Sequence, residues 1–232
     1  MLPEAPVVIS EGRSFPVERR YLPLPAHQRF DEAVAVATAE MLRQESGSLL
    51  LFLPGVGEIQ RVQEQLASRI GSDVLLCPLY GALSLNDQRK AILPAPQGMR
   101  KVVLATNIAE TSLTIEGIRL VVDCAQERVA RFEPRTGLTR LITQRVSQAS
   151  MTQRAGRAGR LEPGICLHLI AKEQAERAAA QSEPEILQSD LSGLLMELLQ
   201  WGCSDPAQMS WLDQPPAVNL QAAKRLLRML GA

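Results

Sequence analysis

One segment carries an amide, three arginines and two glycines at close spacing: it runs from Gln153 to Arg160 and reads QRAGRAGR. On an α-helix, which turns about 100° per residue, Gln153, Arg157 and Arg160 share one face and Arg154 points elsewhere. A guanidinium pairs phosphate oxygens through two parallel hydrogen bonds, and an amide can position a water molecule. The segment therefore predicts a face for phosphoryl transfer; the alternative is a basic helix that only meets solvent or forms salt bridges.

The two glycines of this predicted helix, Gly156 and Gly159, favour the first interpretation. Each costs roughly 1 kcal/mol relative to alanine inside a helix. Together they leave a flank of small residues that permits close approach. A helix that only carries surface charge has little reason to contain them.

A second polar segment, residues 105–115, follows a predicted strand that ends at Thr106, and it reads ATNIAETSLTI. Ligands of open α/β sheets bind at the carboxyl ends of the strands. Hydroxyl and amide side chains at such a place suit contacts with a phosphate backbone. Capping of the following helix is the alternative, but capping accounts for only one or two of these side chains.

The charge distribution adds to this interpretation. The chain has no net charge, yet the stretch from Arg128 to Arg160 contains eight arginines, no lysine and one acid, Glu133. Such a basic stretch often meets phosphate, although a solvated basic surface stays an open alternative. Aromatic residues make up only 3% of the chain, which is too few for a platform on which bases stack.

Composition narrows the class of protein. The chain has 232 residues, of which 46% are hydrophobic and 22% charged, as expected of a soluble globular protein. The apolar runs are too short to span a bilayer, and the N-terminus lacks a secretory pattern, so we expect no membrane association and a cytoplasmic location. No metal site is expected, because the four cysteines are widely separated: Cys77, Cys124, Cys166 and Cys203.

The elements that must hold the two polar segments alternate along the chain. Nearly continuous apolar runs, typical of parallel strands buried on both faces, occupy residues 48–53, 74–79, 101–106, 119–123 and 164–170. Helical patterns occupy residues 27–44, before the first run, and residues 57–70 and 84–92, between the runs that follow. We therefore predict an α/β fold with an open, mostly parallel sheet and helices on both faces. The first twenty or so residues, broken by prolines, are interpreted as a lead-in.

Two regions depart from this alternation. Strand-like runs at 128–132 and 138–142 flank a turn with proline and glycine, which predicts a projecting antiparallel β-hairpin. After residue 172 the pattern is helical, with predicted helices at 186–201 and 219–230. We expect a lead-in over residues 1–13, a main domain over 14–172 and a small, partial helical module over 173–232.

Four segments in this order resemble the motifs of the DEAH-type RNA helicases. The resemblance covers most of residues 14–216, is nearest to a bacterial branch of that family, and rests on residues 50–59, 78–83, 105–115 and 153–160, which resemble motif IV, the motif after it, motif V and motif VI. It implies that residues 14–172 form a RecA-like domain, the second of the two motor lobes. It also implies that residues 173–232 begin a winged-helix domain and that the hairpin separates strands.

The resemblance implies a role for several residues at a nucleotide site. Gln153 would orient the hydrolytic water, and Arg157 and Arg160 would contact the triphosphate as arginine fingers. Ser112 would sense the nucleotide state, and Asp123 would lie near the nucleotide. A further residue, Ile92, stands where relatives often place a phenylalanine that stacks on adenine, so only weak discrimination between bases is expected.

The resemblance also implies contacts with single-stranded nucleic acid, RNA rather than DNA. These contacts would be independent of base sequence and would be made by Thr106, Asn107, Thr111, Arg128, Arg131 and Arg135.

The chain lacks a Gly-x-x-x-x-Gly-Lys-[Ser/Thr] phosphate-binding loop and an Asp-Glu-Ala-His motif. ATP with Mg²⁺ is therefore expected to be bound mainly by a first RecA-like domain in cis, and the chain alone is expected to be inactive. One alternative is a non-enzymatic module that binds nucleic acid or protein. Another is a complete small nucleotide hydrolase, which conflicts with the missing loop.

Overall fold

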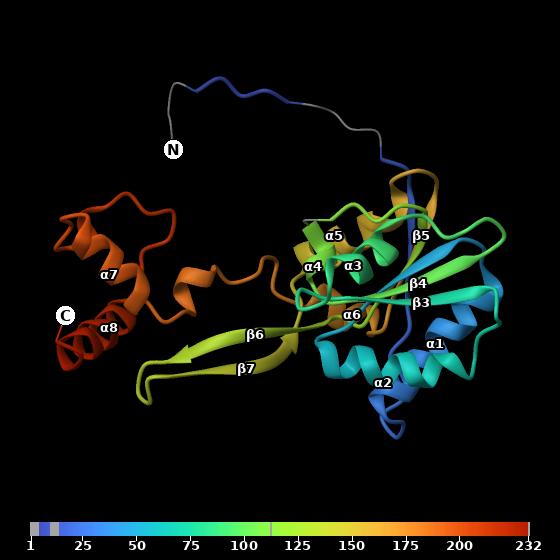
Figure 1. Cartoon of the computed structure of the whole chain (residues 1–232), viewed down its shortest axis with the longest axis horizontal. Helices are drawn as coiled ribbons and strands as arrows, with labels where there is room; N and C mark the ends of the chain where they lie inside the picture. The colour runs from blue at the N-terminus through green and yellow to red at the C-terminus, as the bar shows by residue number, and fades with distance from the viewer. Residues whose placement is uncertain (1–4, 10–13, 112, 232) are drawn as a thin grey trace. The chain divides into compact units, whose positions relative to one another are not determined.

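The computed structural model describes residues 5–9, 14–111 and 113–231 (Figure 1). The chain forms two compact units. The first contains the residues up to 125 together with 150–177, and the second contains 126–149 together with the residues from 178 onward. The hairpin therefore groups with the C-terminal helices. The domain limits expected at residues 13 and 172 stay a prediction.

In the described part of the first unit, six parallel strands form one sheet in the order β1-β8-β5-β2-β4-β3. The predicted parallel α/β sheet is confirmed, because the five apolar runs all form strands. The strands are β1 (Val17–Tyr21), β2 (Ser48–Phe52), β3 (Val74–Leu79), β4 (Arg100–Ala105), β5 (Ile118–Asp123) and β8 (Gly164–His168).

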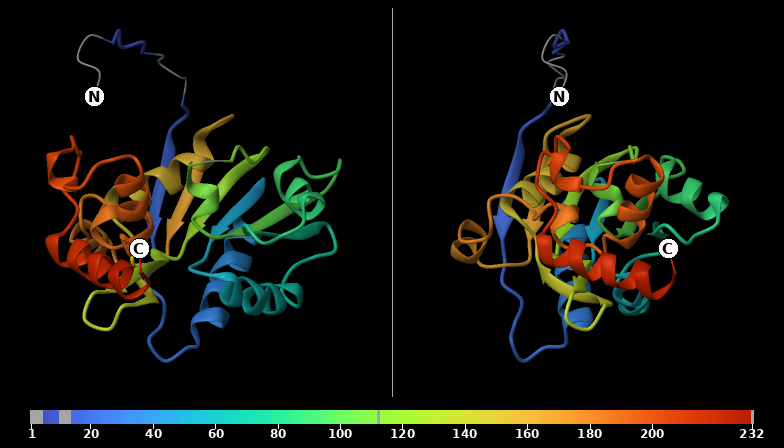
Figure 2. Two further views of the ribbon diagram at one scale, coloured as in Figure 1. Left: turned by 60° about the vertical axis from the view of Figure 1, so that its left-hand side comes forward. Right: turned by 90° about the vertical axis from the view of Figure 1, so that its left-hand side faces the viewer.

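Helices cover both faces of this sheet, as the two views of Figure 2 show. On one face α1 (Phe30–Gln44) and α2 (Val56–Ala67) pack on Leu49 and Leu51. Ile59, Val62 and Leu66, spaced three and four residues apart on α2, are fully buried there. Each such side chain stabilises the fold by about 1.5–3 kcal/mol.

The opposite face packs on Leu50 and Phe52, the alternate residues of β2. Four short elements contribute to this core: α3 (Leu85–Ile92), α4 (Ile108–Thr111), α5 (Gln148–Gly156) and the 3-10 helix η1 (Arg157–Gly159). Three of them, α4, α5 and η1, contain parts of the two polar segments described above. Helix α6 (Lys172–Glu176) follows β8.

Strand β1 was missed by the sequence analysis, which placed it in the lead-in. Its sequence, VERRY, has no apolar run, because it lies at the edge of the sheet and pairs only with β8. An edge strand is solvated on one side, so it can carry charged residues that a central strand cannot.

The second unit contains the predicted hairpin, which is confirmed and is longer than expected. Strands β6 (Gln126–Glu133) and β7 (Leu138–Arg145) pair antiparallel around a turn in which Gly137 has a φ of 69°. Phe132 is buried, and its N–H donates to the carbonyl of Gln188 at 2.7 Å, which ties the hairpin to the helical part of the unit.

The helical part of the second unit differs from the prediction at residues 186–201. The single helix expected over residues 186–201 is two elements, the 3-10 helix η2 (Glu185–Leu187) and α7 (Ser192–Gln200). The break follows from Asp190, whose carboxylate accepts from the N–H and the hydroxyl of Ser192 at 2.9 and 2.6 Å. Such local side-chain bonds compete with the helix.

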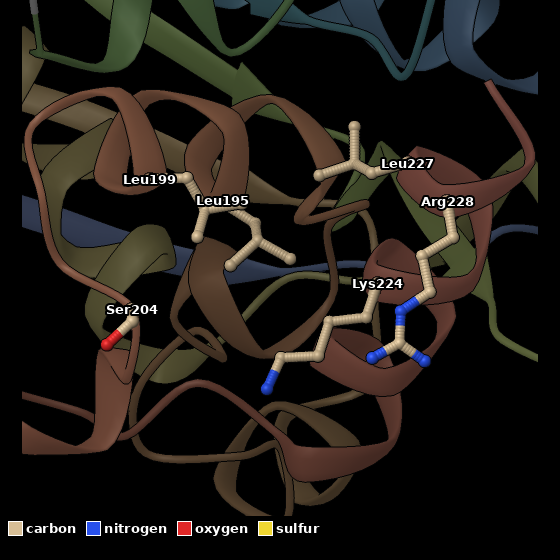
Figure 3. A pocket seen from close by; sticks show the side chains of 6 residues that line it. All are labelled: Leu195, Leu199, Ser204, Lys224, Leu227 and Arg228. Carbon is tan, nitrogen blue, oxygen red and sulfur yellow. The ribbon is translucent and has the colours of Figure 1, made fainter. Parts of the chain in front are cut away.

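A further 3-10 helix, η3 (Pro206–Gln208), precedes α8 (Ala217–Met229), which was predicted over 219–230. Helices α7 and α8 share a small core that contains Leu195, Ala223 and Leu227. Beside it lies a pocket of about 280 Å³, shown in Figure 3 and lined by Leu195, Leu199, Ser204, Lys224, Leu227 and Arg228.

Within the described residues, no helix combines the length and the apolar character needed to cross a lipid bilayer.

Candidate functional site

The two polar segments meet at the carboxyl edge of the sheet. Residues 105–115 leave β4 and contain α4, and residues 148–160 form α5 and η1. Their contact is made through Glu110 of α4, whose Oε2 accepts from the hydroxyl of Ser150 at 2.8 Å and from Nε of Arg154 at 3.0 Å.

Arg154 lies at the centre of this contact. The sequence analysis directed it away from the face of Gln153 and Arg160, and it does point away from these two exposed residues, into the core. Its side chain is only 1% exposed, and its NH1 donates to Oδ1 of Asp123 at 2.8 Å. Its guanidinium carbon lies 4.9 Å from the centroid of the Phe52 ring. Arg154 thus bridges the ends of two strands and the segment that follows a third.

Asp123 is fully buried at the end of β5. Its Oδ1 also accepts from the N–H of Ala125 at 2.9 Å, and its Oδ2 lies 2.9 Å from Nδ1 of His168. Burial by itself would raise the pKa of Asp123, but Arg154 and His168 together lower it to about 2. Its carboxylate is enclosed by these partners, and its expected place near the nucleotide stays a prediction.

His168 completes this buried network. Nε of Arg19 on β1 donates to its Nε2 at 3.0 Å, so the imidazole carries its proton on Nδ1 and donates it to Asp123. The thiol of Cys166 lies 3.5 Å from the same Nε2, a spacing seen in Cys-His-Asp nucleophile sites. The thiol is fully buried, however, and burial raises its pKa, so it is inert.

Arg157 is also buried, at 6% exposure, although it was expected to share one polar face with Gln153 and Arg160. Its Nε and NH2 donate to the carbonyl of Glu110, and its NH1 donates to the carbonyl of Leu113 at 2.8 Å. Burial lowers its pKa, and the neighbouring Arg160 lowers it further. The arginine therefore holds the backbone of the 105–115 segment in this conformation.

Gln153 and Arg160 are exposed, and NH1 of Arg160 donates to the hydroxyl of Thr114 at 2.9 Å. They do not belong to one continuous α-helix as expected. Helix α5 ends at Gly156, and a 3-10 turn with different angular spacing follows. The predicted common face of the amide and both arginines is therefore wrong for Arg157.

Gly156 and Gly159 differ in the space around their Cα atoms. A Cβ on Gly159 would lie 2.5 Å from the carbonyl oxygen of Phe15, whose N–H donates to the Gly159 carbonyl at 2.8 Å. A Cβ on Gly156 would meet nothing within 4 Å. Close approach thus explains Gly159, and it does not explain Gly156.

The remaining predicted residues of the first unit differ in exposure where the structure describes them. Thr106 is half-buried, Asn107 and Thr111 are exposed, and Ser112 lies outside the described residues. Ile92, at the end of α3, is half-buried. The predicted hairpin residues belong to the second unit, where Arg128 is half-buried and the other two, Arg131 and Arg135, are exposed.

Lys101 is another residue that the sequence analysis missed. It lies on β4 with only 1% exposure, and its ammonium group donates to the carbonyls of Ala91, Ile92 and Leu93 at the end of α3. Burial lowers its pKa. A cation at the carbonyl end of a helix is stabilising, and this one fixes the position of Ile92.

One signal could have revealed the buried network before the structure. A carboxylate at the end of an otherwise apolar strand, as Asp123 is, requires a charged or hydrogen-bonding partner. Arg154 was therefore a candidate partner, whereas Glu110, His168 and Arg19 carry no comparable signal. Among the described residues, no group of three or more His, Cys, Asp or Glu side chains could hold a metal ion.

Comparisons with known proteins bear on this arrangement. Residues 32–162 match the family described as helicase conserved C-terminal domain. The chain is 97% identical over 232 residues to the ATP-dependent RNA helicase HrpB of Escherichia coli (strain K12), and the match covers all of the chain and 29% of that protein. It is 38% identical over 242 residues to the human probable ATP-dependent RNA helicase DHX34, with 98% of the chain and 21% of that protein covered.

Two solved structures agree. The crystal structure of the Escherichia coli DEAH/RHA helicase HrpB has a TM-score of 0.97 at 97% identity, over 100% of this chain and 30% of that one. The crystal structure of the E. coli DExH-box NTPase HrpB has a TM-score of 0.93, over 100% and 29%. The chain thus spans less than a third of the length of these relatives, and the resemblance to DEAH-type helicases is confirmed.

Proposed function

Because the chain belongs to the helicase conserved C-terminal domain family, we propose that it is the second motor lobe of a DEAH-type, ATP-dependent RNA helicase that acts in the cytoplasm. The names of its relatives, which are ATP-dependent RNA helicases, support this proposal. The observation that carries it is the contact of the 105–115 and 148–160 segments at the carboxyl edge of the sheet, where ligands of such sheets bind. Residues 14–172 would form the lobe, and 173–232 would begin a winged-helix domain.

On the nucleotide side, the proposal assigns the exposed Gln153 and Arg160 to the reaction. Gln153 would orient water with its amide, and Arg160 would neutralise negative charge on the phosphoryl group. Arg157 would be a second finger once its guanidinium exchanges the carbonyls of Glu110 and Leu113 for phosphate oxygens. An arginine finger accelerates comparable hydrolases by roughly 10³–10⁵-fold.

ATP with Mg²⁺, held mainly by a first RecA-like lobe in cis, would supply the phosphoryl group that water attacks. The donor set of this chain fits that division, since exposed guanidinium and amide groups suit phosphate oxygens and not a metal ion. Ser112 would sense the nucleotide. Ile92 would cover the base with an aliphatic side chain, so base discrimination would be weak.

On the nucleic-acid side, the proposal assigns contacts with the backbone of single-stranded RNA. Such contacts are independent of base sequence and weaken as salt is added. The assigned residues are Thr106, Asn107, Thr111, Arg128, Arg131 and Arg135, of which the three arginines lie on the hairpin.

The test is ATP hydrolysis by a full-length protein that carries this chain, with and without single-stranded RNA. Arg160→Ala is expected to lower turnover at least 10³-fold, the lower end of the finger range. Arg43→Ala is the matched control, because Arg43 is an exposed arginine of α1 that pairs with Glu40 on the same helix.

Near-normal turnover by the Arg160→Ala protein would contradict its assigned role. No ATP hydrolysis by the unaltered full-length protein would favour a non-enzymatic binding module. Hydrolysis by this chain alone would instead indicate a complete small hydrolase.

A further inference from the structure

Glu110 receives hydrogen bonds from three residues of the α5–η1 segment. Its carboxylate accepts from Ser150 and Arg154, and its backbone carbonyl accepts from Arg157. Its side chain is 14% exposed, whereas that of Arg154 is 1% exposed. One residue thus carries much of the contact between the segment proposed to bind RNA and the segment proposed to act on ATP.

The same residue is built into the turn that carries the proposed RNA contacts. The N–H of Glu110 donates to the carbonyl of Asn107 at 2.9 Å, and the N–H of Ala109 donates to the carbonyl of Thr106 at 3.3 Å. Because α4 has only four residues and begins directly after Asn107, a shift at Thr106 or Asn107 moves Glu110 as well.

The other side of the contact is fixed in place. Arg154 is clamped between Asp123, with His168 behind it, and the ring of Phe52. Breaking a fully buried ion pair leaves an uncompensated charge, so Arg154 stays with Asp123 while the more exposed Glu110 can move. Arg157, which is bonded to the Glu110 carbonyl, feels any such movement directly.

We propose that Glu110 is a positioning residue that couples RNA binding on Thr106, Asn107 and Thr111 to the release and placement of Arg157 for ATP hydrolysis. It touches neither ligand. Its carboxylate sets where the α4 turn lies relative to Arg154, and its carbonyl holds Arg157 until that turn moves. This inference rests on the proposed function of the chain.

The test compares Glu110→Ala, Glu110→Gln and Glu116→Ala in the full-length protein. Glu116 is an exposed glutamate that follows the same segment and serves as the matched control. The readout is the ratio of RNA-stimulated to basal ATP turnover, with kcat and the KM for ATP determined separately. Coupling between sites commonly amounts to roughly 5–150-fold.

Glu110→Ala is expected to lower the stimulation ratio at least about fivefold, through kcat and not through the KM for ATP. Glu110→Gln keeps an acceptor oxygen for Ser150 and Arg154, so it should restore part of the ratio. It also keeps the proposal testable if the alanine protein fails to fold. Glu116→Ala should match the unaltered protein.

Two results would overturn the coupling. One is an unchanged stimulation ratio in Glu110→Ala, and the other is an equal fall in basal and stimulated turnover, which would indicate a general structural defect. An unaltered protein that hydrolyses no ATP, or that RNA does not stimulate, would instead overturn the proposed function itself.

Discussion

The arginines between residues 128 and 160 form one basic stretch in sequence but two different populations in the structure. In the first unit, Arg154 and Arg157 are 1% and 6% exposed, and the guanidinium of each is bonded to specific acceptors. In the second unit, the hairpin arginines lie half-buried or exposed: Arg128, Arg131, Arg135, Arg140 and Arg145.

The difference shows that the density of positive charge does not identify which arginines meet a ligand. In the first unit, burial forces an arginine to find a carboxylate or carbonyls, so its charge stabilises the fold. On the hairpin, Arg131 and Arg140 stand directly opposite each other in the strand register. Like charges in such a pair are destabilising, so they suit a surface that an anion neutralises.

The largest loss of stability is expected when Arg154 is replaced. Arg154→Ala leaves Asp123 buried without its cationic partner and should lower the free energy of unfolding by about 3–5 kcal/mol, measured by urea denaturation of the chain. Arg140→Ala is the control from the hairpin and should change stability by no more than about 0.5 kcal/mol. A loss of unfolding free energy below about 1 kcal/mol for Arg154→Ala would contradict the stabilising role of this buried arginine.

Acid should weaken the buried network while leaving the hairpin arginines charged. The pKa of Asp123 is about 2 in the folded chain, below its ordinary value of 3.8. Its contribution, about 2 kcal/mol by linkage, is therefore present above about pH 4 and lost as the pH falls toward about 2.

Urea denaturation at about pH 6 and at about pH 3 measures this loss. Asp123→Asn should flatten the dependence of stability on pH, because the amide does not titrate. Asp213→Asn is the matched control, since Asp213 is an exposed aspartate whose replacement should leave the dependence as it is in the unaltered protein. Equal pH slopes for the unaltered and Asp123→Asn proteins would argue against the assignment.

Within the first unit, Gly159 is closely packed and Gly156 is not. Gly159→Ala places a methyl group against the Phe15 carbonyl and should destabilise the chain by about 1 kcal/mol or more. Gly156→Ala enters open space and should leave stability unchanged or slightly raised. Thermal unfolding of the two variants distinguishes them, and equal effects would show that close packing at Gly159 is not the reason for its identity.

The smallest effect is expected on the hairpin. Replacing Arg131 by alanine removes one exposed ion pair with Glu183, worth at most about 1 kcal/mol. If the hairpin binds single-stranded RNA, the same change should lower the slope of log affinity against log salt by roughly 0.7. Fluorescence anisotropy with a labelled oligouridylate measures this slope for the chain, and Arg43→Ala should leave it unchanged.

Much of the fold could be predicted because it depends on local patterns. Among the described residues, continuous apolar runs predicted five of the six strands of the parallel sheet, since strands buried on both faces exclude polar residues. Helix α2 was predicted from the spacing of Ile59, Val62 and Leu66. The edge strand β1 was not, because a strand with one neighbour and a solvated side need not carry such a run.

The candidate site could be predicted only in part. The sequence located both polar segments, and the structure places them in contact. It placed Arg157 on a common face with Gln153 and Arg160, because it extended the helical spacing past Gly156, where a 3-10 turn begins. It also did not predict the buried ion pairs of Arg154. The partners of these arginines lie 31 to 47 residues away in sequence, so no local pattern contains them.

By itself, then, the sequence determined the class of fold, the place of the two polar segments and the chemistry that guanidinium and amide groups can perform, because these follow from residue types and short-range spacing. Only the tertiary structure decided which arginine is a buried support, which holds a backbone and which is exposed to a ligand. The physical reason is that burial and hydrogen-bond partners are set by strands and helices brought together from distant parts of the chain.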